Sequence, residues 1–201
     1  DNAILHLGIL NSLRIWNFYK IPKNVRSYAN TGGFGIDGCL SALIGASLVN
    51  PTKLYFGILG DLAFFYDMNS LWNRYVGNNI RLLIINNGCG TEFKNYNHAA
   101  KIFGKETDFY IAAKGHYGNK SKKLIRDYAE DLGFLYYSAS SKEEYLKILP
   151  EFIDPKIGNK SVIVEIFTDS DAESEAYKIL NEGKFETKKE IVTEKITLPE
   201  W

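Results

Sequence analysis

Two short polar segments stand at the ends of strongly apolar runs, and both carry side chains that bind metal ions. Gly60-Asp61 follows the run LYFGIL, and Asn86-Asn87 follows the run IRLLII. Burying the carboxylate of Asp61 between two apolar elements is costly unless a partner compensates its charge. Carboxylate and amide oxygens suit Mg²⁺, which proteins often bind together with phosphate groups. The pattern therefore predicts a site for magnesium and a phosphorylated ligand.

Three loops rich in glycine and short polar side chains are each expected to follow a strand. They read NTGGFGIDG (30–38), GDLA (60–63) and NNGCGTEF (86–93). In an open parallel sheet, ligands bind at the carboxyl ends of the strands, where helix N-termini also present N–H groups to anions. Glycine lets the backbone approach a ligand closely. We therefore expect a diphosphate and its Mg²⁺ to contact all three loops.

Apolar runs and helical periodicities alternate along the chain, which is typical of an α/β fold. Leu5, Ile9, Leu13 and Trp16 have helical spacing and predict a helix from Ile4 to Tyr19. The other expected helices are 39–49, 63–76, 121–133 and 142–153, and the expected strands are 25–30, 53–59, 80–87, 108–115, 134–139 and 161–168. Uninterrupted apolar runs indicate strands covered on both faces. We therefore predict a three-layer α/β sandwich, with a mostly parallel central sheet of about five to six strands and helices on both faces.

Composition limits the number of domains and the kinds of partner. The 201 residues include 24 basic and 24 acidic side chains, so no excess of charge indicates binding to nucleic acid or a membrane surface. With 45% hydrophobic residues the chain can bury the core of one domain, expected at 1–183, before a charged tail of unknown structure at 184–201. No apolar run has the length of a membrane span or the layout of a signal peptide, and only two cysteines occur, so we expect a cytoplasmic protein. Because the chain begins with Asp1 rather than Met, we expect it to be part of a longer protein.

The combination of Gly60-Asp61 and Asn86-Asn87, separated by an expected strand, helix and strand, resembles the metal–diphosphate motif of thiamine diphosphate enzymes. A second Asn-Asn pair, at 78–79, precedes its strand and is expected at the opposite edge of the sheet. The segments NTGGFGIDGCLSALIGAS, GDLAFFYDMNSL and VIVEIFTDSDAESEAYKIL extend the similarity over most of the chain. They resemble the C-terminal diphosphate-binding domain of the menaquinone-pathway succinyl-enolpyruvyl-hydroxycyclohexene-carboxylate synthases and, more distantly, of acetolactate synthases.

The resemblance implies the thiamine diphosphate-binding fold, with thiamine diphosphate and Mg²⁺ as cofactors. It makes Asp61, Asn87 and the backbone carbonyl of Cys89 the metal ligands. Ile36 matches the bulky apolar residue that supports the bent cofactor, although in most chains such a residue would be ordinary core. The residues that it assigns to cofactor binding are Gly35, Ile36, Gly60, Leu62, Ala63, Asn87 and Gly90.

The resemblance also implies what the chain lacks. In these enzymes the glutamate that activates the cofactor comes from a separate pyrimidine-binding domain or subunit, so no catalytic residue is expected here. We expect a part of a lyase or transferase, a carboligase or decarboxylase acting on a small 2-oxo acid, inactive in isolation and homodimeric. The alternative is a non-catalytic α/β binding or assembly domain that retains only the fold.

Two positions differ from the menaquinone-pathway enzymes. Those enzymes carry an arginine for the acidic substrate where this sequence has Thr31, and a second arginine near the place of Trp16. Here Arg14 is displaced from that place along its helix. We therefore predict that the parent protein uses another 2-oxo acid.

Several residues have simpler interpretations that the sequence leaves open. Asp61 alone would be an ordinary helix N-cap, and Asp37 is expected to cap the helix that follows it. His98 either lines a substrate pocket or lies in a surface loop, and His6 is expected on the first helix. The segment KGHYGNKS (114–121) resembles a phosphate-binding loop only weakly, although it could begin a helix that contacts an anion.

Overall fold

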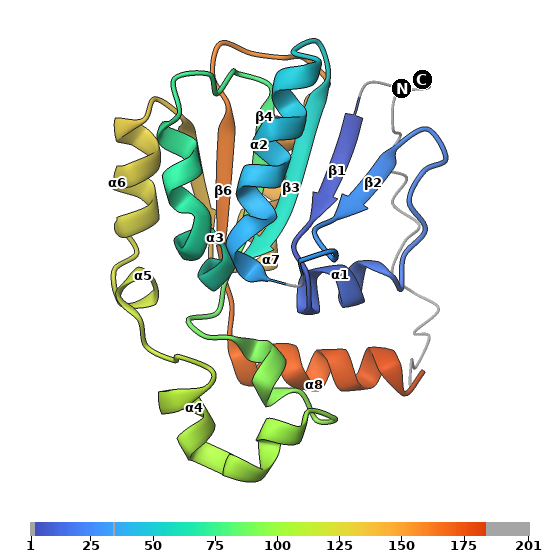
Figure 1. Ribbon diagram of the computed structural model, residues 1–201, viewed down its shortest axis with the longest axis vertical. Coiled ribbons are helices and arrows are strands. Elements are labelled where there is room, and N and C mark those ends of the chain that lie inside the picture. The colour runs from blue at the N-terminus through green and yellow to red at the C-terminus, as the bar shows by residue number, and fades with distance from the viewer. Residues whose placement is uncertain (1–2, 34, 184–201) are drawn as a thin grey trace.

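A six-stranded sheet, parallel throughout, forms the centre of the computed structural model, which describes residues 3–33 and 35–183 (Figure 1). The strands are β1 (Ala3–Leu7), β2 (Arg26–Ala29), β3 (Leu54–Gly60), β4 (Ile80–Asn86), β5 (Leu135–Ala139) and β6 (Val162–Phe167), in the order β2-β1-β3-β4-β6-β5. The chain leaves β1 toward one edge and β3 toward the other. Their boundary is therefore the switch point where open α/β sheets bind ligands.

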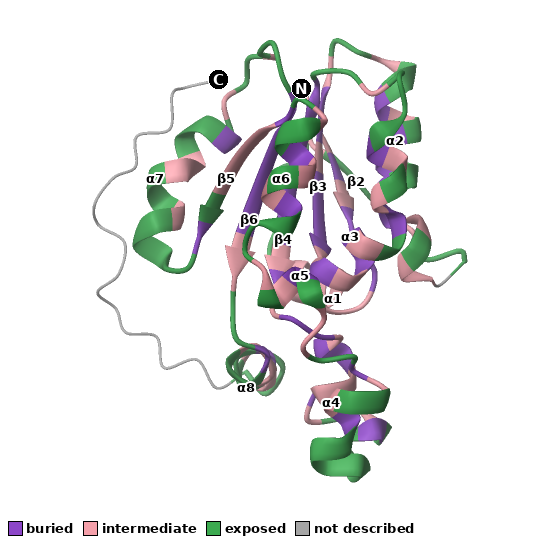
Figure 2. Cartoon of the chain, turned by 90° about the vertical axis from the view of Figure 1, so that its left-hand side faces the viewer, coloured by how far each residue is buried: buried purple, intermediate pink, exposed green. Residues whose placement is uncertain are grey.

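Helices cover both faces of this sheet. The α-helices are α1 (Asn11–Trp16), α2 (Cys39–Val49), α3 (Asp61–Asp67), α4 (Thr107–Tyr110), α5 (Tyr117–Lys120), α6 (Leu124–Asp131), α7 (Lys142–Phe152) and α8 (Ser170–Asn181). The described residues also form the 3-10 helices η1 (Ile36–Gly38), η2 (Met68–Trp72), η3 (Thr91–Lys94) and η4 (Ala99–Glu106). One core lies beneath α2, α3 and α6, and a second beneath α7 and α1, so the predicted three-layer α/β fold is confirmed (Figure 2).

Close packing of α2 on the sheet depends on a glycine in β3. A Cβ atom at Gly57 would lie 2.6 Å from Leu43 Cδ2 and 2.8 Å from Leu82 Cδ2. Both leucines are almost fully buried, so neither can move aside without opening the core. The small residue in the strand thus sets the distance between the helix and the sheet.

The predicted helix from Ile4 to Tyr19 is wrong in its first half. Residues Ala3–Leu7 form β1, which pairs with β2 on one side and β3 on the other. Leu5 and Leu7 pack into one core while Ile4 contacts the other. A strand that is covered on both faces therefore buries the same apolar residues whose spacing predicted a helix. Leu10 has a φ of 69°, which ends the extended segment before α1. His6 consequently lies in a strand rather than on a helix.

Three further expectations are corrected. The strand expected at 108–115 is a single helical turn, α4, followed by a turn with Ala113 at φ 51°. The helix expected at 63–76 begins at Asp61 and continues beyond Asp67 only as the 3-10 helix η2. Asp37 lies inside η1 and caps nothing, because α2 follows Gly38 without a side-chain cap.

The other helices and strands that the sequence predicts are present within a few residues of their expected positions. Helix α8 is not among the predicted helices. No helix in the described part of the chain is long and apolar enough to cross a membrane. The charged tail expected at 184–201 lies outside the described residues.

One buried polar network interrupts the apolar sheet. Glu165 on β6 is 1% exposed and accepts hydrogen bonds from Asn86 Nδ2 and Tyr136 Oη, both at 2.5 Å. Asn86 Nδ2 also donates to the carbonyl of Gly118 (3.2 Å). Burial raises the pKa of the Glu165 carboxyl above its ordinary value, although both hydrogen bonds oppose the shift. The network therefore joins β4, β5, β6 and α5 at the cost of a buried ionisable group.

Replacing Glu165 with Gln should make stability less sensitive to rising pH. Because folding raises the pKa of Glu165, its neutral carboxyl contributes to the stability of the folded chain below the ordinary pKa of 4.5. This contribution is lost as the pH rises through the raised pKa. A glutamine can accept from Asn86 and donate to the Tyr136 oxygen without a charge. Urea unfolding across this pH range should show that the free energy of unfolding of Glu165→Gln rises relative to that of the parent chain, by on the order of 1 kcal/mol at neutral pH.

The exposed Glu175→Gln is the control for loss of a negative charge and should change stability by less than about 0.5 kcal/mol. A constant difference between Glu165→Gln and the parent at every pH would contradict the assignment of Glu165 as the titrating group.

Candidate functional site

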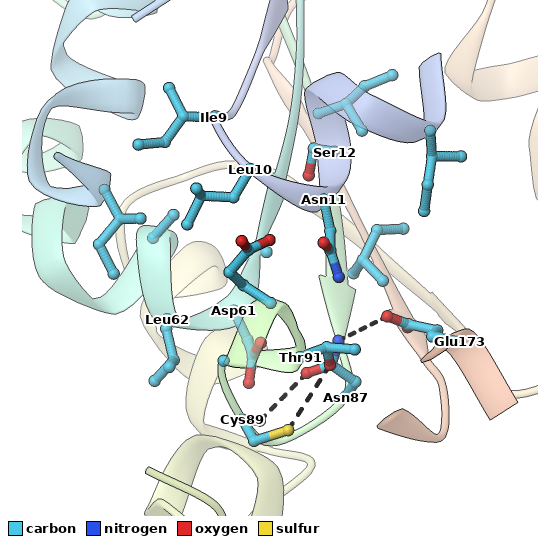
Figure 3. A pocket seen from close by; sticks show the side chains of 18 of the residues that line it. Ile9, Leu10, Asn11, Ser12, Asp61, Leu62, Asn87, Cys89, Thr91 and Glu173 are labelled. Carbon is cyan, nitrogen blue, oxygen red and sulfur yellow. Dashed lines mark hydrogen bonds between the residues drawn. The ribbon is translucent and has the colours of Figure 1, made fainter. Parts of the chain in front are cut away.

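A cavity of about 510 Å³ opens at the carboxyl edge of the sheet, at the boundary of β1 and β3 (Figure 3). Its wall is apolar in large part, and Asp61, Asn87, Cys89 and Thr91 lie together at one end of it. The apolar lining residues include Ile9, Leu10, Ile15, Trp16, Ile36, Ile58, Leu62, Leu83, Ile85 and Phe93. A largely apolar cavity with a few polar groups at one end is typical of a site for an organic cofactor.

Asp61 is the polar centre of this end. It is the first residue of α3, its residue exposure is 1%, and it makes no helix-capping hydrogen bond. Its Oδ2 atom accepts from the backbone N–H of Gly88 (3.1 Å) and contacts Nε2 of His116 (2.5 Å). The pairing of Gly60 with Ile85 brings the ends of β3 and β4 side by side. Asp61 therefore joins two of the three predicted loops instead of capping its own helix.

Asn87 has its amide orientation fixed by two hydrogen bonds. Its Oδ1 accepts from the N–H of Cys89 (3.1 Å), and its Nδ2 donates to Oε2 of Glu173 on α8 (2.8 Å). An amide oxygen has two lone pairs, so Oδ1 retains acceptor capacity for a metal ion. The two hydrogen bonds therefore hold the amide in one orientation, with Oδ1 as the atom that can accept a further ligand.

The charge at this end of the cavity is negative. Asp61, Glu92 and Glu173 line the cavity, and no lysine or arginine is among the described residues that do so. Glu92 is paired with Arg14, whereas Asp61 and Glu173 have no lysine or arginine partner within the described part of the chain. Burial raises the pKa of Glu173, and the nearby charge of Asp61 adds to this effect, while hydrogen bonds from Thr168 and Asn87 oppose it. The cavity therefore favours a bound cation.

The donor set suits a hard cation of the magnesium type. The described residues contain no group of three or more histidine, cysteine, aspartate or glutamate side chains able to hold a metal. A site here must use one carboxylate with amide and backbone oxygens, as Mg²⁺ does when phosphate and water supply the other ligands. The Cys89 thiol is buried, which raises its pKa, and lies 3.6 Å from Thr91 Oγ1. The thiol of Cys89 is therefore poorly suited to bind a metal ion through its sulfur.

The structure brings most of the predicted site residues to this one cavity. Those that line it are Ile36, Gly60, Asp61, Leu62, Ala63, Asn87, Cys89 and Gly90. Gly35 is not among the lining residues, and a Cβ there would lie 2.2 Å from the Asp37 carboxylate. Asn79 of the second Asn-Asn pair lies at the opposite edge, as expected, where it donates to the carbonyls of Ser47 and Lys53.

Two residues at the site escape sequence reasoning. His116 precedes α5 and contacts Asp61, while Glu173 on α8 binds Asn87. Both come from segments that return to the sheet edge far along the chain from Asp61 and Asn87. His116 lies in the segment 114–121, which the sequence identifies only as a weak match to a phosphate-binding loop; it does begin a helix, α5, and its histidine contacts the Asp61 carboxylate. His98, for which a pocket was one of two expectations, caps η4 and packs on Phe93 at 5.3 Å between ring centroids; it does not line the cavity.

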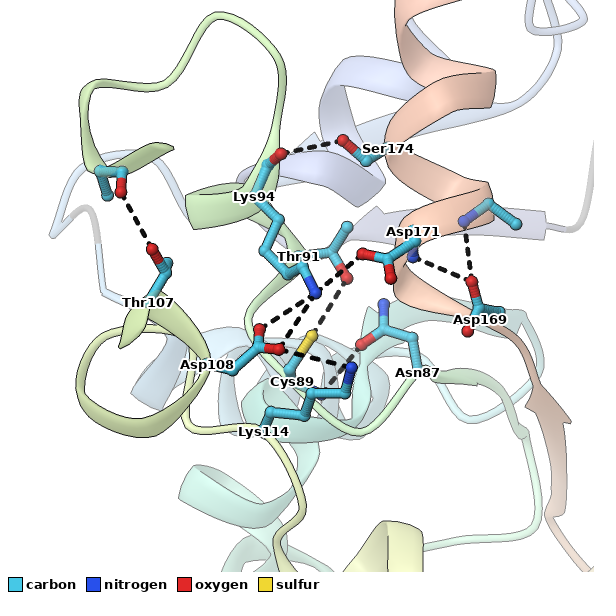
Figure 4. A network of polar contacts seen from close by, with 12 residues as sticks. Asn87, Cys89, Thr91, Lys94, Thr107, Asp108, Lys114, Asp169, Asp171 and Ser174 are labelled. Carbon is cyan, nitrogen blue, oxygen red and sulfur yellow. Dashed lines mark hydrogen bonds and ion pairs between the residues drawn. The ribbon is translucent and has the colours of Figure 1, made fainter. Parts of the chain in front are cut away.

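An ion-pair cluster outside the cavity holds α8 in place (Figure 4). Lys94 Nζ lies 3.0 Å from Asp108 Oδ1 and 2.8 Å from Asp171 Oδ1, and Lys114 pairs with Asp108 at 3.4 Å. Burial would lower the pKa of Lys94, but the two carboxylates outweigh it and raise that pKa. Ser174 Oγ also donates to the carbonyl of Lys94 (3.0 Å). These contacts fix the face of α8 that presents Glu173 to Asn87.

Residues 11–166 match the family described as thiamine pyrophosphate enzyme, C-terminal TPP binding domain. The chain is similar to three proteins named 2-succinyl-5-enolpyruvyl-6-hydroxy-3-cyclohexene-1-carboxylate synthase. Identity is 33% over 88% of this chain for Bacteroides fragilis, 34% over 87% for Phocaeicola vulgatus and 30% over 89% for Bacteroides thetaiotaomicron. The matched part is 30% of each relative, so this chain corresponds to less than a third of their length.

Proposed function

The chain belongs to the thiamine pyrophosphate enzyme family as a C-terminal TPP-binding domain, and we propose that it binds thiamine diphosphate with Mg²⁺ as part of a 2-oxo acid carboligase or decarboxylase. The observation that carries the proposal is the pair of carboxylates, Asp61 and Glu173, in an apolar cavity lined by no lysine or arginine among the described residues. A diphosphate brings further negative charge, so it requires an accompanying dication here.

The residues present fit such an ion. Asp61 and Asn87 would hold it through side-chain oxygens and Cys89 through its backbone carbonyl. When bound, Mg²⁺ neutralises diphosphate charge and fixes its position. The chain contributes by holding Asn87 in the required orientation through Glu173 and Cys89. The apolar wall of the cavity would also keep water away from the cofactor rings, which Ile36 would support.

The backbone at the start of α3 completes the proposed diphosphate site. Gly60, Leu62 and Ala63 line the cavity beside Asp61, and Gly90 lines it from the loop after β4. Backbone N–H groups of a first helical turn lack partners within the helix and can bind phosphate oxygens. This arrangement favours cofactor binding over the alternative of a domain that retains only the fold.

Substrate recognition is proposed to lie elsewhere in the complete enzyme. The relatives are named for a product with a carboxylate, yet Arg14 is engaged by Glu92 and does not line the cavity. Trp16 lines it instead. We propose a 2-oxo acid donor that is held by residues of the pyrimidine-binding domain or subunit, with this chain in a cytoplasmic homodimer.

Removing either proposed metal ligand should weaken Mg²⁺-dependent binding of thiamine diphosphate. Asp61→Ala deletes the carboxylate and Asn87→Ala the amide oxygen, so each should weaken binding by at least about 10-fold. Titration calorimetry with thiamine diphosphate, with and without Mg²⁺, measures the loss. Asn78→Ala changes the same residue type at the opposite edge and should bind like the parent chain. Equal Mg²⁺-dependent binding by Asp61→Ala and the parent would reject the metal site.

The chain alone should self-associate and yet be catalytically silent. Ile102, Phe109 and Tyr110 are each more than three-quarters exposed, and apolar surface of this kind favours association into the dimer that we propose. Nothing in the chain is assigned to activate the cofactor, so proton exchange at the thiazolium carbon should match that of the free cofactor. Sedimentation gives the mass, and NMR with Mg²⁺, thiamine diphosphate and pyruvate gives the exchange rate.

Exchange well above the free-cofactor rate would show that a residue of this chain activates the cofactor, contrary to the proposal that the activating group lies in the pyrimidine-binding domain or subunit. The Glu173→Gln variant then identifies the source, because Glu173 is the cavity carboxylate whose pKa is raised by burial. A monomeric mass at all concentrations would contradict the proposed homodimer separately.

A longer protein that contains this chain should not form the relatives' product. Thr31 stands where those enzymes carry an arginine, and Arg14 is already paired with Glu92. Turnover of isochorismate and 2-oxoglutarate, followed by mass spectrometry, should therefore be at least about 100-fold slower than with another 2-oxo acid donor. Robust turnover of that pair would show that the carboxylate is bound by other residues.

A further inference from the structure

His116 makes the shortest recorded contact to Asp61 and has no role in the sites assigned so far. Its Nδ1 accepts from the N–H of Asn119 (3.2 Å), which caps α5. A nitrogen that accepts carries no proton, so in the neutral ring the proton lies on Nε2. Nε2–H then donates to Oδ2 of Asp61 at 2.5 Å. The hydrogen-bond partners thus fix which tautomer faces the carboxylate.

We infer that His116 is a positioning residue that turns one oxygen of Asp61 toward the metal, an inference that rests on the proposed function. Oδ2 receives two donors, Nε2–H of His116 and the backbone N–H of Gly88. No hydrogen bond to Oδ1 is recorded within the described residues, so Oδ1 is the oxygen left for the cation. Partners of this kind orient ligands and typically change metal affinity by about 10- to 100-fold when removed.

The imidazole is held firmly enough to act in this way. Its side chain is 19% exposed, and its ring packs edge-on against Phe65 with centroids 5.3 Å apart. A Cβ at Gly118 would lie 2.0 Å from the Phe65 ring, so α5 approaches α3 as closely as a glycine permits. Gly115 N–H donates to the carbonyl of Gly88 (3.0 Å), which anchors the start of this segment to the loop after β4.

The same contacts allow two roles of His116 to be separated by substitution. The side-chain amide of glutamine places an N–H donor near the position of Nε2, whereas asparagine places its oxygen near Nδ1. His116→Gln therefore retains a donor for Asp61 and loses the cap, while His116→Asn retains the cap and loses the donor. His98 supplies the matched control, because it caps η4 through Nδ1 and makes no contact with Asp61.

The experiment measures Mn²⁺ binding, used as a probe for Mg²⁺, by electron paramagnetic resonance in the presence of thiamine diphosphate. His116→Asn should weaken Mn²⁺ binding about 10-fold or more, and His116→Gln should remain within about 3-fold of the parent chain. His98→Asn and His98→Gln should bind like the parent. In the metal-free parent at about pH 8, nitrogen NMR should show the proton of His116 on Nε2.

Other outcomes are decisive. Unchanged binding by His116→Asn, or a greater loss in His116→Gln, would show that the residue only caps α5. A proton on Nδ1 would also overturn the inference. Failure of the unaltered chain to bind Mn²⁺ with thiamine diphosphate would instead reject the proposed function, and the inference with it.

Discussion

The burial of one carboxylate sets the requirements for the whole carboxyl edge of the sheet. Asp61 is almost inaccessible to solvent, so its charge must be met by donors or by a cation. The parallel pairing of β3 and β4 supplies one donor by placing the loop after β4 beside it. The segment before α5 supplies the other. Both donors reach the same atom, Oδ2, so the other carboxylate oxygen retains its acceptor capacity.

Much of this site could be predicted because its central residues adjoin apolar strands. Asp61 and Asn87 each follow a run that is buried on both faces, and parallel strands bring their carboxyl ends to one edge. Position in the sequence therefore fixes position in space for these two residues. Gly35 shows the limit of that reasoning, because a neighbour of a lining residue need not line the cavity itself.

The errors and omissions share a physical cause. Periodicity assigned Leu5 and Ile9 to one helix, but strand pairing on both sides of β1 determines the structure there. His116 and Glu173 reach the site from 55 and 86 residues away in sequence from their partners. Their positions are set by tertiary contacts, the Glu165 network and the Lys94 cluster, that have no local signature. Local structural propensity depends on residues that are close together in sequence, whereas these tertiary contacts form only when the sheet has assembled.

The contact between Glu173 and Asn87 has a consequence for the order in which the protein is made. Synthesis proceeds from the N-terminus, so Asp61 and Asn87 leave the ribosome well before α8 exists. Until β6 has joined β4 and α8 has docked through Asp171 and Ser174, the amide of Asn87 lacks the acceptor that orients it. The polar end of the cavity is thus completed by the last helix that the structure describes. The proposed cofactor site is consequently complete only after the sheet has closed, and in a nascent chain Asn87 lacks its hydrogen bond to Glu173 until that moment.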